Sequence, residues 1–369
     1  MLFTAILLLF LTQKTFADTV TAKSFCVMNS VTGEIVTEKN SNEKLPMAST
    51  TKIITLLVAL ENSKPEDVVT VSREAVLEEG SSAYLKPGAK ITMRDVCYGL
   101  MLNSGNDAAI AIAEHISGGT EKFAELMNET AKKIGVNNTH FVNPNGLHDD
   151  AHYTTASDLA RLTRYALKND TFREIVSSRM YTSSMLMPDG TTENVEYINH
   201  NRLLKEVDGC IGVKTGFTKT AGRCLVSAIN RNTAEYIIVT LNDSDDWNTH
   251  KELCENTFES GNERKIIKNG ECIKHAVNGK EECRLVTADS FYVFTHGNKN
   301  NFEVIKHLPK TIDFPLNKGE KAGYIEIKNN GETIGIVDVV AEKDFNPQGS
   351  AQVENCFKFT FLNILRNLI

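Results

Sequence analysis

Hydrophobic and polar residues in the first 260 positions follow two different periods. Apolar residues recur at helical spacing in residues 49–62, and the same period predicts helices at 93–101, 107–116, 121–134, 156–169 and 246–260. Shorter β-like runs lie before and after these helices, at 24–29, 34–37, 222–229 and 234–241. Strands at both ends with helices between them indicate an α/β unit whose sheet is antiparallel.

The pattern changes near residue 262. From there to about residue 347, short β-like runs alternate with Gly and Asn turns, and Asn329-Asn330-Gly331 has the composition of a hairpin turn. A chain of 369 residues is long enough for two domains. We therefore predict a larger domain over residues 18–262 and a small all-β domain over residues 263–350.

The N-terminus has the pattern of an export signal. Residues 2–11 are apolar, too few to span a bilayer but enough for a signal-peptide core, and Thr15 and Ala17 supply small residues for cleavage. No Lys or Arg precedes the run, and a buried N-terminal strand or helix is the alternative. We predict a signal peptide over residues 1–17 and an exported protein.

The last dozen residues form two faces when they are drawn as a helix. One broad face is apolar, and its members are Phe357, Phe361, Leu362, Ile364, Leu365, Leu368 and Ile369. Such a helix is too short to span a membrane but suits the membrane interface, although it has only two basic residues. Residues 351–369 are predicted to anchor the protein on a membrane surface, with docking on its own core as the alternative.

Composition narrows the choice of partners. Hydrophobic residues make up 41% and charged residues 24%, as in soluble globular proteins, and the formal net charge is −7. This charge argues against nucleic acid as the main partner, because phosphate binding needs a basic face. Eight cysteines in an exported chain could form disulfides, and Cys272 with Cys283 is the first pair to consider. Cys97 and Cys224 lie in apolar segments and are expected in the core.

The start of the helix at 49–62 carries a possible nucleophile. In Ser49-Thr50-Thr51-Lys52, positions i and i+3 are neighbours on one face, so the Lys52 side chain can reach the Ser49 hydroxyl. A serine needs a base beside it, and a lysine acts as one only when burial or nearby cations lower its pKa. Free N–H groups at the helix N-terminus could hold an oxyanion. Taken alone, Ser49 could equally be a helix N-cap.

Two further motifs extend this pattern. Ser104-Gly105-Asn106 connects two predicted helices, and its hydroxyl and amide could share a cleft. Lys214-Thr215-Gly216, followed by Phe217, precedes the predicted strand at 222–229, where a cation and a hydroxyl can hold a carboxylate and Gly216 permits close approach. In this order and spacing, the motifs match the Ser-x-x-Lys, Ser-Asp-Asn and Lys-Thr-Gly signature of penicillin-binding proteins and class A β-lactamases, with Gly105 in place of the Asp.

The sequence resembles the low-molecular-weight penicillin-binding proteins, the serine D-alanyl-D-alanine carboxypeptidases, in which Gly is usual at the middle of the second motif. The likeness also includes segments 45–52, 102–108, 143–147, 152–156 and 208–216. It implies an α/β (α+β) penicillin-binding/β-lactamase-like transpeptidase domain with an antiparallel sheet and a helical cluster, a small all-β C-terminal domain and often an amphipathic tail, with no cofactor and no metal. Ile211 departs from the family, which usually has Asp there, and this puts local support of the strand in question.

The resemblance also assigns roles to individual residues. Ser49 would attack the carbonyl between the two terminal D-alanines of a peptidoglycan stem peptide, and Lys52 would take its proton. Ser104 would relay a proton to the departing D-alanine, while Asn106 would hydrogen-bond the acyl side and steady Lys52.

The third motif would bind the other end of the substrate. Lys214 and Thr215 would hold the terminal carboxylate, and the backbone N–H groups of Ser49 and Phe217 would form the oxyanion hole. A β-lactam antibiotic, as a mimic of D-Ala-D-Ala, would leave a long-lived acyl-enzyme on Ser49.

Three other functions fit parts of the sequence. A β-lactamase would need a deacylating carboxylate between the second and third motifs, where the candidates are Asp149, Asp150, Glu174, Glu193 and Glu196. A zinc enzyme would need ligands, and two clusters offer some, His148-Asp149-Asp150 with His152 and Asp245-Asp246 with His250, but neither has a helical His-x-x-x-His spacing. A catalytically silent wall-binding or antibiotic-sensing protein is the third alternative, which the intact Ser49, Lys52 and Lys214 disfavour.

Overall fold

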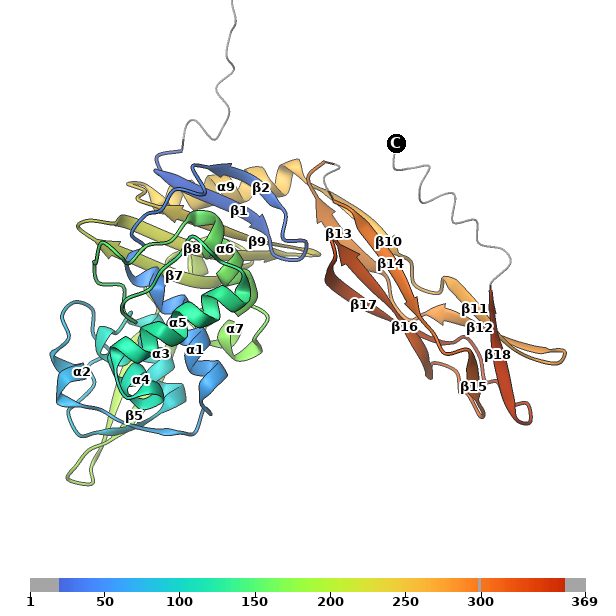
Figure 1. Cartoon of the computed structure of the whole chain (residues 1–369), viewed down its shortest axis with the longest axis horizontal. Helices are drawn as coiled ribbons and strands as arrows, with labels where there is room; N and C mark the ends of the chain where they lie inside the picture. The colour runs from blue at the N-terminus through green and yellow to red at the C-terminus, as the bar shows by residue number, and fades with distance from the viewer. Residues whose placement is uncertain (1–19, 298–299, 356–369) are drawn as a thin grey trace, which may run out of the picture. The chain divides into compact units, whose positions relative to one another are not determined.

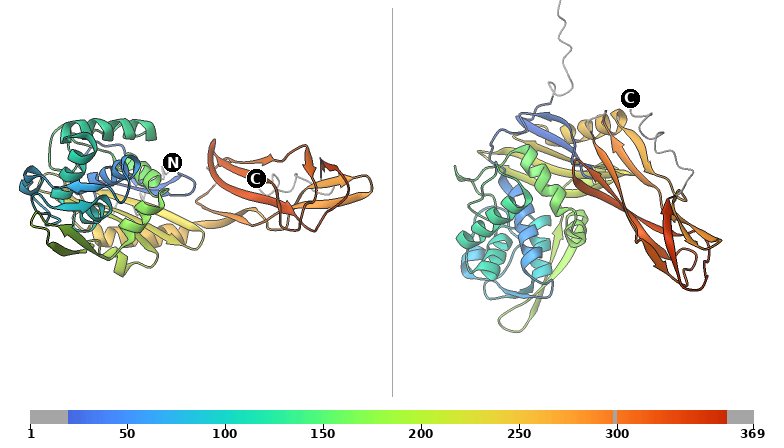
Figure 2. Two further views of the ribbon diagram at one scale, coloured as in Figure 1. Left: turned by 90° about the horizontal axis from the view of Figure 1, so that it is seen from below. Right: turned by 45° about the vertical axis from the view of Figure 1, so that its right-hand side comes forward.

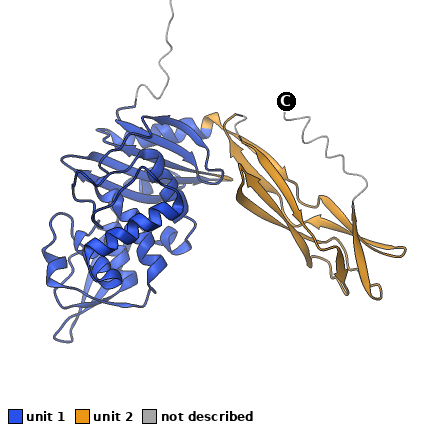
Figure 3. Ribbon diagram, viewed as in Figure 1, with its two compact units in different colours: residues 1–231, 235–258 blue, residues 232–234, 259–369 orange. Residues whose placement is uncertain are grey.

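The computed structural model describes residues 20–297 and 300–355 (Figure 1). The predicted signal peptide and residues 356–369 of the predicted tail lie outside the described residues. The chain folds into two compact units (Figure 3). The first contains the residues up to Arg231 and Glu235–Phe258, and the second contains Asn232–Ala234 and the residues from Glu259 onward.

The first unit is built around a five-stranded sheet with the strand order β2-β1-β9-β8-β7. The strands are β1 (Ser24–Asn29), β2 (Ile35–Lys39), β7 (Cys210–Thr218), β8 (Gly222–Arg231) and β9 (Ala234–Leu241). β1 pairs antiparallel with β2 and β9, and β7 pairs antiparallel with β8. All eight residues of β9 are buried, so both faces of the sheet are covered there.

Helices cover the two faces of this sheet in unequal numbers (Figures 1 and 2). On one face lies α9 (Asp246–Ser260), whose buried His250 bonds Ser227 of β8 and Thr240 of β9. The alternate residues of β8, such as Val226, belong to a large core shared with a cluster of helices. The cluster consists of α1 (Lys52–Asn62), α3 (Met93–Leu102), α4 (Asn106–Ser117), α5 (Thr120–Ile134), α6 (Ala156–Ala166) and α7 (Asp170–Ser177).

The helical period of the sequence was sufficient to predict most of these elements, but it missed several short ones. The helices predicted at 93–101, 107–116, 121–134 and 246–260 are confirmed within about two residues, and the helix at 49–62 begins with a 3-10 turn, η2 (Ala48–Thr51). The short helices α2 (Arg73–Leu77) and α8 (Leu203–Glu206), and also α7, were not predicted. Neither was a four-stranded sheet of β3 (Val68–Thr70), β4 (Lys90–Thr92), β5 (Met180–Leu186) and β6 (Thr192–Ile198).

The second unit is β-rich, as the turn-rich sequence predicts. It contains a pair of strands, β10 (Asn262–Ile267) with β13 (Phe291–Thr295), and a sheet in the order β14-β16-β17-β12-β11-β18-β15. The members of that sheet are β11 (Cys272–Asn278), β12 (Glu281–Thr287), β14 (Phe302–His307), β15 (Thr311–Asp313), β16 (Lys321–Asn329), β17 (Glu332–Ala341) and β18 (Ser350–Asn355). Asn330 and Gly331 join β16 to β17 with φ of 50° and 86°, as a tight hairpin requires.

Two expectations for the second unit are wrong. Residues 351–355 are not part of a helix, because they belong to β18, which pairs with β11 and β15. Cys272 and Cys283 are not joined by a disulfide, since Cys283 lies opposite Ala276 and Cys272 opposite Val286 in the β11–β12 pair. Cys97 and Cys224 are buried in the core, as predicted. Within the described part of the chain, no helix has the length and apolar character needed to cross a membrane.

Candidate active site

Ser49 and Lys52 lie on the first turn of the structure that the helical pattern predicts at 49–62. Lys52 Nζ is 3.0 Å from Ser49 Oγ, and it also donates to Asn106 Oδ1 and to the Asn145 carbonyl, both at 2.7 Å. The Lys52 side chain is fully buried. Burial, reinforced by the nearby Lys214 cation, holds the pKa of Lys52 well below its usual 10.5. The lysine therefore meets the condition under which it can act as a base toward Ser49.

The second motif forms a tight connection between α3 and α4. Ser104 is buried and has a left-handed φ of 58°, and Asn106 begins α4. A Cβ atom on Gly105 would lie 2.7 Å from Ala83 Cβ and 2.7 Å from Asp107 Oδ1. The absence of a side chain at Gly105 is therefore a packing requirement, and it explains why the Asp of the general signature is missing here.

The third motif places strand β7 against the nucleophile turn. A Cβ atom on Gly216 would lie 3.1 Å from the backbone nitrogen of Ser49, so a side chain at this position would crowd the turn. Lys214 is buried, and its Nζ donates to the Thr215 carbonyl at 3.0 Å. Burial lowers the pKa of Lys214 to about 7. Phe217 is 65% exposed beside this site.

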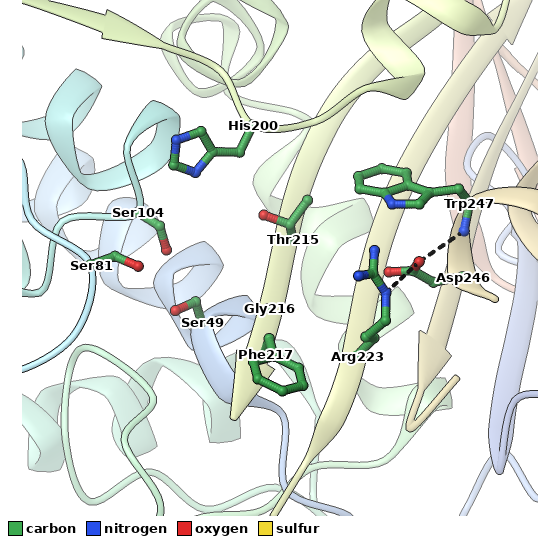
Figure 4. A pocket seen from close by; sticks show the side chains of 10 residues that line it. All are labelled: Ser49, Ser81, Ser104, His200, Thr215, Gly216, Phe217, Arg223, Asp246 and Trp247. Atoms are coloured by element: carbon green, nitrogen blue, oxygen red, sulfur yellow. Dashed lines mark hydrogen bonds and ion pairs between the residues drawn. The ribbon is translucent and has the colours of Figure 1, made fainter. Parts of the chain in front are cut away.

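A pocket of about 300 Å³ opens between these motifs (Figure 4). Ser49, Ser104, Thr215, Gly216 and Phe217 line it, so the structure brings together parts of all three motifs. Its remaining lining consists of Ser81, His200, Arg223, Asp246 and Trp247, of which only Asp246 was a candidate from sequence, as a possible zinc ligand.

The additional lining residues come from elements without a recognisable motif. Arg223 lies opposite Phe217 on β8, and its Nε donates to Asp246 Oδ1 at 2.8 Å. The Arg223 guanidinium also lies over the Trp247 ring, 5.7 Å from its centroid. Only the β7–β8 hairpin register could have suggested Arg223, and nothing in the sequence suggests His200.

The other sequence candidates lie elsewhere or have structural contacts. Asp149, Asp150, Glu174, Glu193 and Glu196 are not in the pocket lining, and Glu174 bonds Arg94 and Tyr98. Among the residues that the structure describes, no group of three or more His, Cys, Asp or Glu side chains could hold a metal ion. Ile211 packs partly buried against the core, which gives the strand apolar support where the family usually has Asp.

Comparisons with known proteins agree with this geometry. The family description D-alanyl-D-alanine carboxypeptidase matches residues 11–245, and the description penicillin-binding protein 5, C-terminal domain, matches residues 262–346. The chain belongs to the D-alanyl-D-alanine carboxypeptidase family.

Individual members of this carboxypeptidase family match most of the chain. DacF of Bacillus subtilis is 30% identical over 341 residues, which cover 89% of this chain and 87% of DacF. The structure of DacD from Francisella tularensis has a TM-score of 0.62 at 28% identity and covers 91% of this chain and 94% of its own. The Streptomyces K15 DD-transpeptidase has a TM-score of 0.63 at 33% identity and covers 65% of this chain and 99% of its own.

Family membership confirms the fold class and the enzyme class predicted from the sequence. The chain is a serine-type carboxypeptidase and a low-molecular-weight penicillin-binding protein, with a mixed α/β transpeptidase domain and an all-β C-terminal domain. The enzyme class also disfavours the zinc and binding-only alternatives.

Proposed function

We propose that this carboxypeptidase removes the terminal D-alanine of peptidoglycan stem pentapeptides through an acyl-enzyme on Ser49. The observation that carries the proposal is the buried Lys52 amine, 3.0 Å from Ser49 Oγ, with its pKa held low. A neutral amine accepts the hydroxyl proton as Oγ bonds to the carbonyl carbon of the scissile peptide. The carbon–nitrogen bond then breaks, the departing D-alanine takes a proton by way of Ser104, and water hydrolyses the ester.

The other motif residues would bind the substrate around this reaction. Asn106 accepts a hydrogen bond of 2.7 Å from Lys52, and it would hydrogen-bond the acyl side of the substrate. The N–H groups of Ser49 and Phe217 flank Gly216 and would stabilise the oxyanion. Lys214 and Thr215 would take the terminal carboxylate, because an ammonium group beside a hydroxyl is suited to an anion and the bound carboxylate itself would favour the protonated form of Lys214.

We further propose that the enzyme acts outside the cytoplasm and is held at the membrane surface. The apolar run at 2–11 supports a signal peptide over 1–17, and the amphipathic pattern from Phe357 to Ile369 supports an interfacial anchor. Flotation with anionic vesicles tests the anchor: residues 18–369 should float and residues 18–355 should not. Equal behaviour of the two proteins would refute it.

Intact-mass analysis of residues 18–355 with benzylpenicillin tests the site. We expect a single penicilloyl adduct on the wild type and none on Ser49→Ala, while Ser81→Ala, which removes another pocket serine, should still be labelled. Release of D-alanine from a diacetylated D-Ala-D-Ala tripeptide should follow the same order. A wild type that takes no label even at short times would refute the serine mechanism, and rapid nitrocefin turnover would favour a β-lactamase.

A further inference from the structure

The peptide group between Ala48 and Ser49 has an N–H and a carbonyl oxygen that lie in different surroundings. Its N–H belongs to Ser49 and is one of the two proposed oxyanion donors. Its carbonyl oxygen points the opposite way, because a trans peptide is planar. That oxygen, Ala48 O, accepts a hydrogen bond of 2.8 Å from Thr51 Oγ1. Because the Thr51 hydroxyl holds the carbonyl oxygen of this peptide group, it also fixes the direction in which the Ser49 N–H points.

Thr51 is in turn bound by a histidine that lies 101 positions away in the sequence. Thr51 Oγ1 lies 2.8 Å from His152 Nε2, and His152 Nδ1 accepts the Val142 N–H at 3.1 Å. Because Nδ1 is an acceptor, the ring proton is placed on Nε2 and is donated to Thr51. The single proton of the Thr51 hydroxyl then goes to Ala48 O. Burial lowers the pKa of His152 to about 4, so the ring is neutral at pH 7.

A second contact restrains the same peptide. Ala48 has a left-handed φ of 49°, which a residue with a side chain rarely adopts. Gly146, at φ 90°, approaches so closely that a Cβ on it would lie 2.0 Å from Ala48 O. The Ala48 carbonyl is thus held between Gly146 and the Thr51 hydroxyl.

We propose that His152 and Thr51 are positioning residues that orient and polarise the Ala48–Ser49 peptide so that the Ser49 N–H binds the oxyanion more strongly. Hydrogen bonds in a chain strengthen one another, and donation to a carbonyl oxygen makes the N–H of the same peptide a better donor. The inference rests on the proposed role of the Ser49 N–H. It assigns a role to His152, which the sequence suggested only as a possible zinc ligand.

Thr51→Val and Thr50→Val form a matched pair for testing the proposal. Both hydroxyls are buried in η2 and donate to a carbonyl three residues earlier, but Thr50 Oγ1 bonds Met47 O, which belongs to the preceding peptide. Two quantities would be measured on residues 18–355, the rate constant of acylation by benzylpenicillin and the infrared stretch of the ¹³C-labelled ester carbonyl in the acyl-enzyme. That carbonyl occupies the oxyanion hole, so its frequency reports on the strength of the donors.

We expect Thr51→Val to slow acylation about tenfold, less than the loss of about 10²–10³-fold on deleting a donor outright, and to move the ester band to higher wavenumber. Thr51→Ser should restore both values, and Thr50→Val should leave the band in place. His152→Asn keeps an acceptor for Val142, but its shorter side chain places no donor at the Nε2 position beside Thr51, and it should shift the band in the same direction as Thr51→Val.

The result that overturns the proposal is an unshifted band in both Thr51→Val and His152→Asn, whatever their rates, because slower acylation alone would indicate a misplaced Lys52. If Thr51→Val does not fold, His152→Asn decides the matter through the same band, with Thr51→Ser as the control that should match the wild type. If the wild type forms no ester on Ser49, the proposed function fails first. If the wild type forms one and the band never moves, only the role of His152 and Thr51 fails.

Discussion

Lys52 Nζ and Ser49 Oγ are 3.0 Å apart, and the lysine is sealed from solvent while the serine faces the pocket. The distance follows from their i, i+3 spacing on one helical turn, which the sequence alone shows. The burial does not follow from the spacing. It depends on Asn106 and on the carbonyl of Asn145, which come from distant segments and take two of the amine's hydrogen bonds.

Replacing Lys52 by Met should slow acylation strongly and preserve the fold. The thioether fills a similar volume, but no base remains to accept the Ser49 proton, so the acylation rate constant should fall by about 10²–10⁴-fold. Stopped-flow mixing with a fluorescent penicillin measures the rate. Lys86→Met, which removes an exposed lysine, is the control. A Lys52→Met variant that is acylated at the wild-type rate would show that another group is the base.

Lys214 should make the protein more stable as the pH rises above neutral. Its pKa is about 7 in the folded state and near 10.5 when the chain is unfolded. Between these values the unfolded state binds more protons, so the free energy of unfolding increases with pH, by at most about 1.4 kcal/mol per pH unit for one lysine. Lys52, whose pKa is also lowered, adds an increase of the same sign.

The free energy of unfolding would be measured with urea at about pH 7.0, 7.5, 8.0 and 8.5, which lie within the range of this rise. Its slope against pH should be smaller for Lys214→Met than for the wild type. The series stops below pH 9 because burial raises the pKa of thiols such as Cys97 from 9.0 to about 12, and their ionisation in the unfolded state opposes the trend. Identical slopes for Lys214→Met and wild type would mean that Lys214 is not neutral in the folded protein.

The sequence was sufficient for the parts of the site that are local or belong to a known motif. Ser49 with Lys52, Ser104 with Asn106, and Lys214 with Thr215 are each close in the chain, and the order of the three motifs indicated that they meet. The contact of His152 with Thr51 and the place of His200 in the pocket depend on how distant loops fold back. The hydrophobic periodicity of the sequence predicts local elements, and it does not predict contacts between distant loops.

Strand register explains the errors in the second unit. Alternation identifies strands, but it does not say which residues lie opposite each other, and a pairing of Cys272 with Cys283 needs that knowledge. The apolar residues of the tail also pointed to a helix beginning at residue 351. Ala351, the first residue of the predicted tail, instead pairs opposite Ile312 and is buried in β18.

Gly105 should not tolerate even a methyl group. In Gly105→Ala the new Cβ would meet Ala83 Cβ and Asp107 Oδ1 at 2.7 Å, and we expect a loss of about 1–3 kcal/mol in the free energy of unfolding. Acylation should also slow, because Ser104 and Asn106 flank the strained position. Gly119→Ala is the control, since its backbone is extended and nothing lies within 4 Å of its Cβ position. Equal chemical denaturation curves for the two variants would contradict this packing argument.

The first unit should fold and react without the second. The Streptomyces K15 enzyme is matched over 99% of its length by 65% of this chain, and the large hydrophobic core shared by the sheet and the helix cluster contains no buried residue beyond Leu241. Residues 18–260 should therefore unfold cooperatively and be acylated by benzylpenicillin at a rate similar to that of residues 18–355. A fragment that is folded but unreactive would show that the β-rich unit contributes to the site.

Trp247 should report acylation directly, because it is the only tryptophan in the sequence and it lines the pocket. Its ring is half-buried and lies near the guanidinium groups of Arg202 and Arg223, at 5.5 and 5.7 Å. A penicilloyl group on Ser49 changes the solvent and charge around the indole, so its fluorescence should change at the rate at which the adduct appears by mass. Ser49→Ala should show no change in fluorescence on mixing with benzylpenicillin. Trp247→Phe should form the adduct without a change in fluorescence. The contrary result is an adduct on the wild type with no change in emission. It would mean that the acyl group lies away from Arg223, Asp246 and Trp247, at the other end of the pocket.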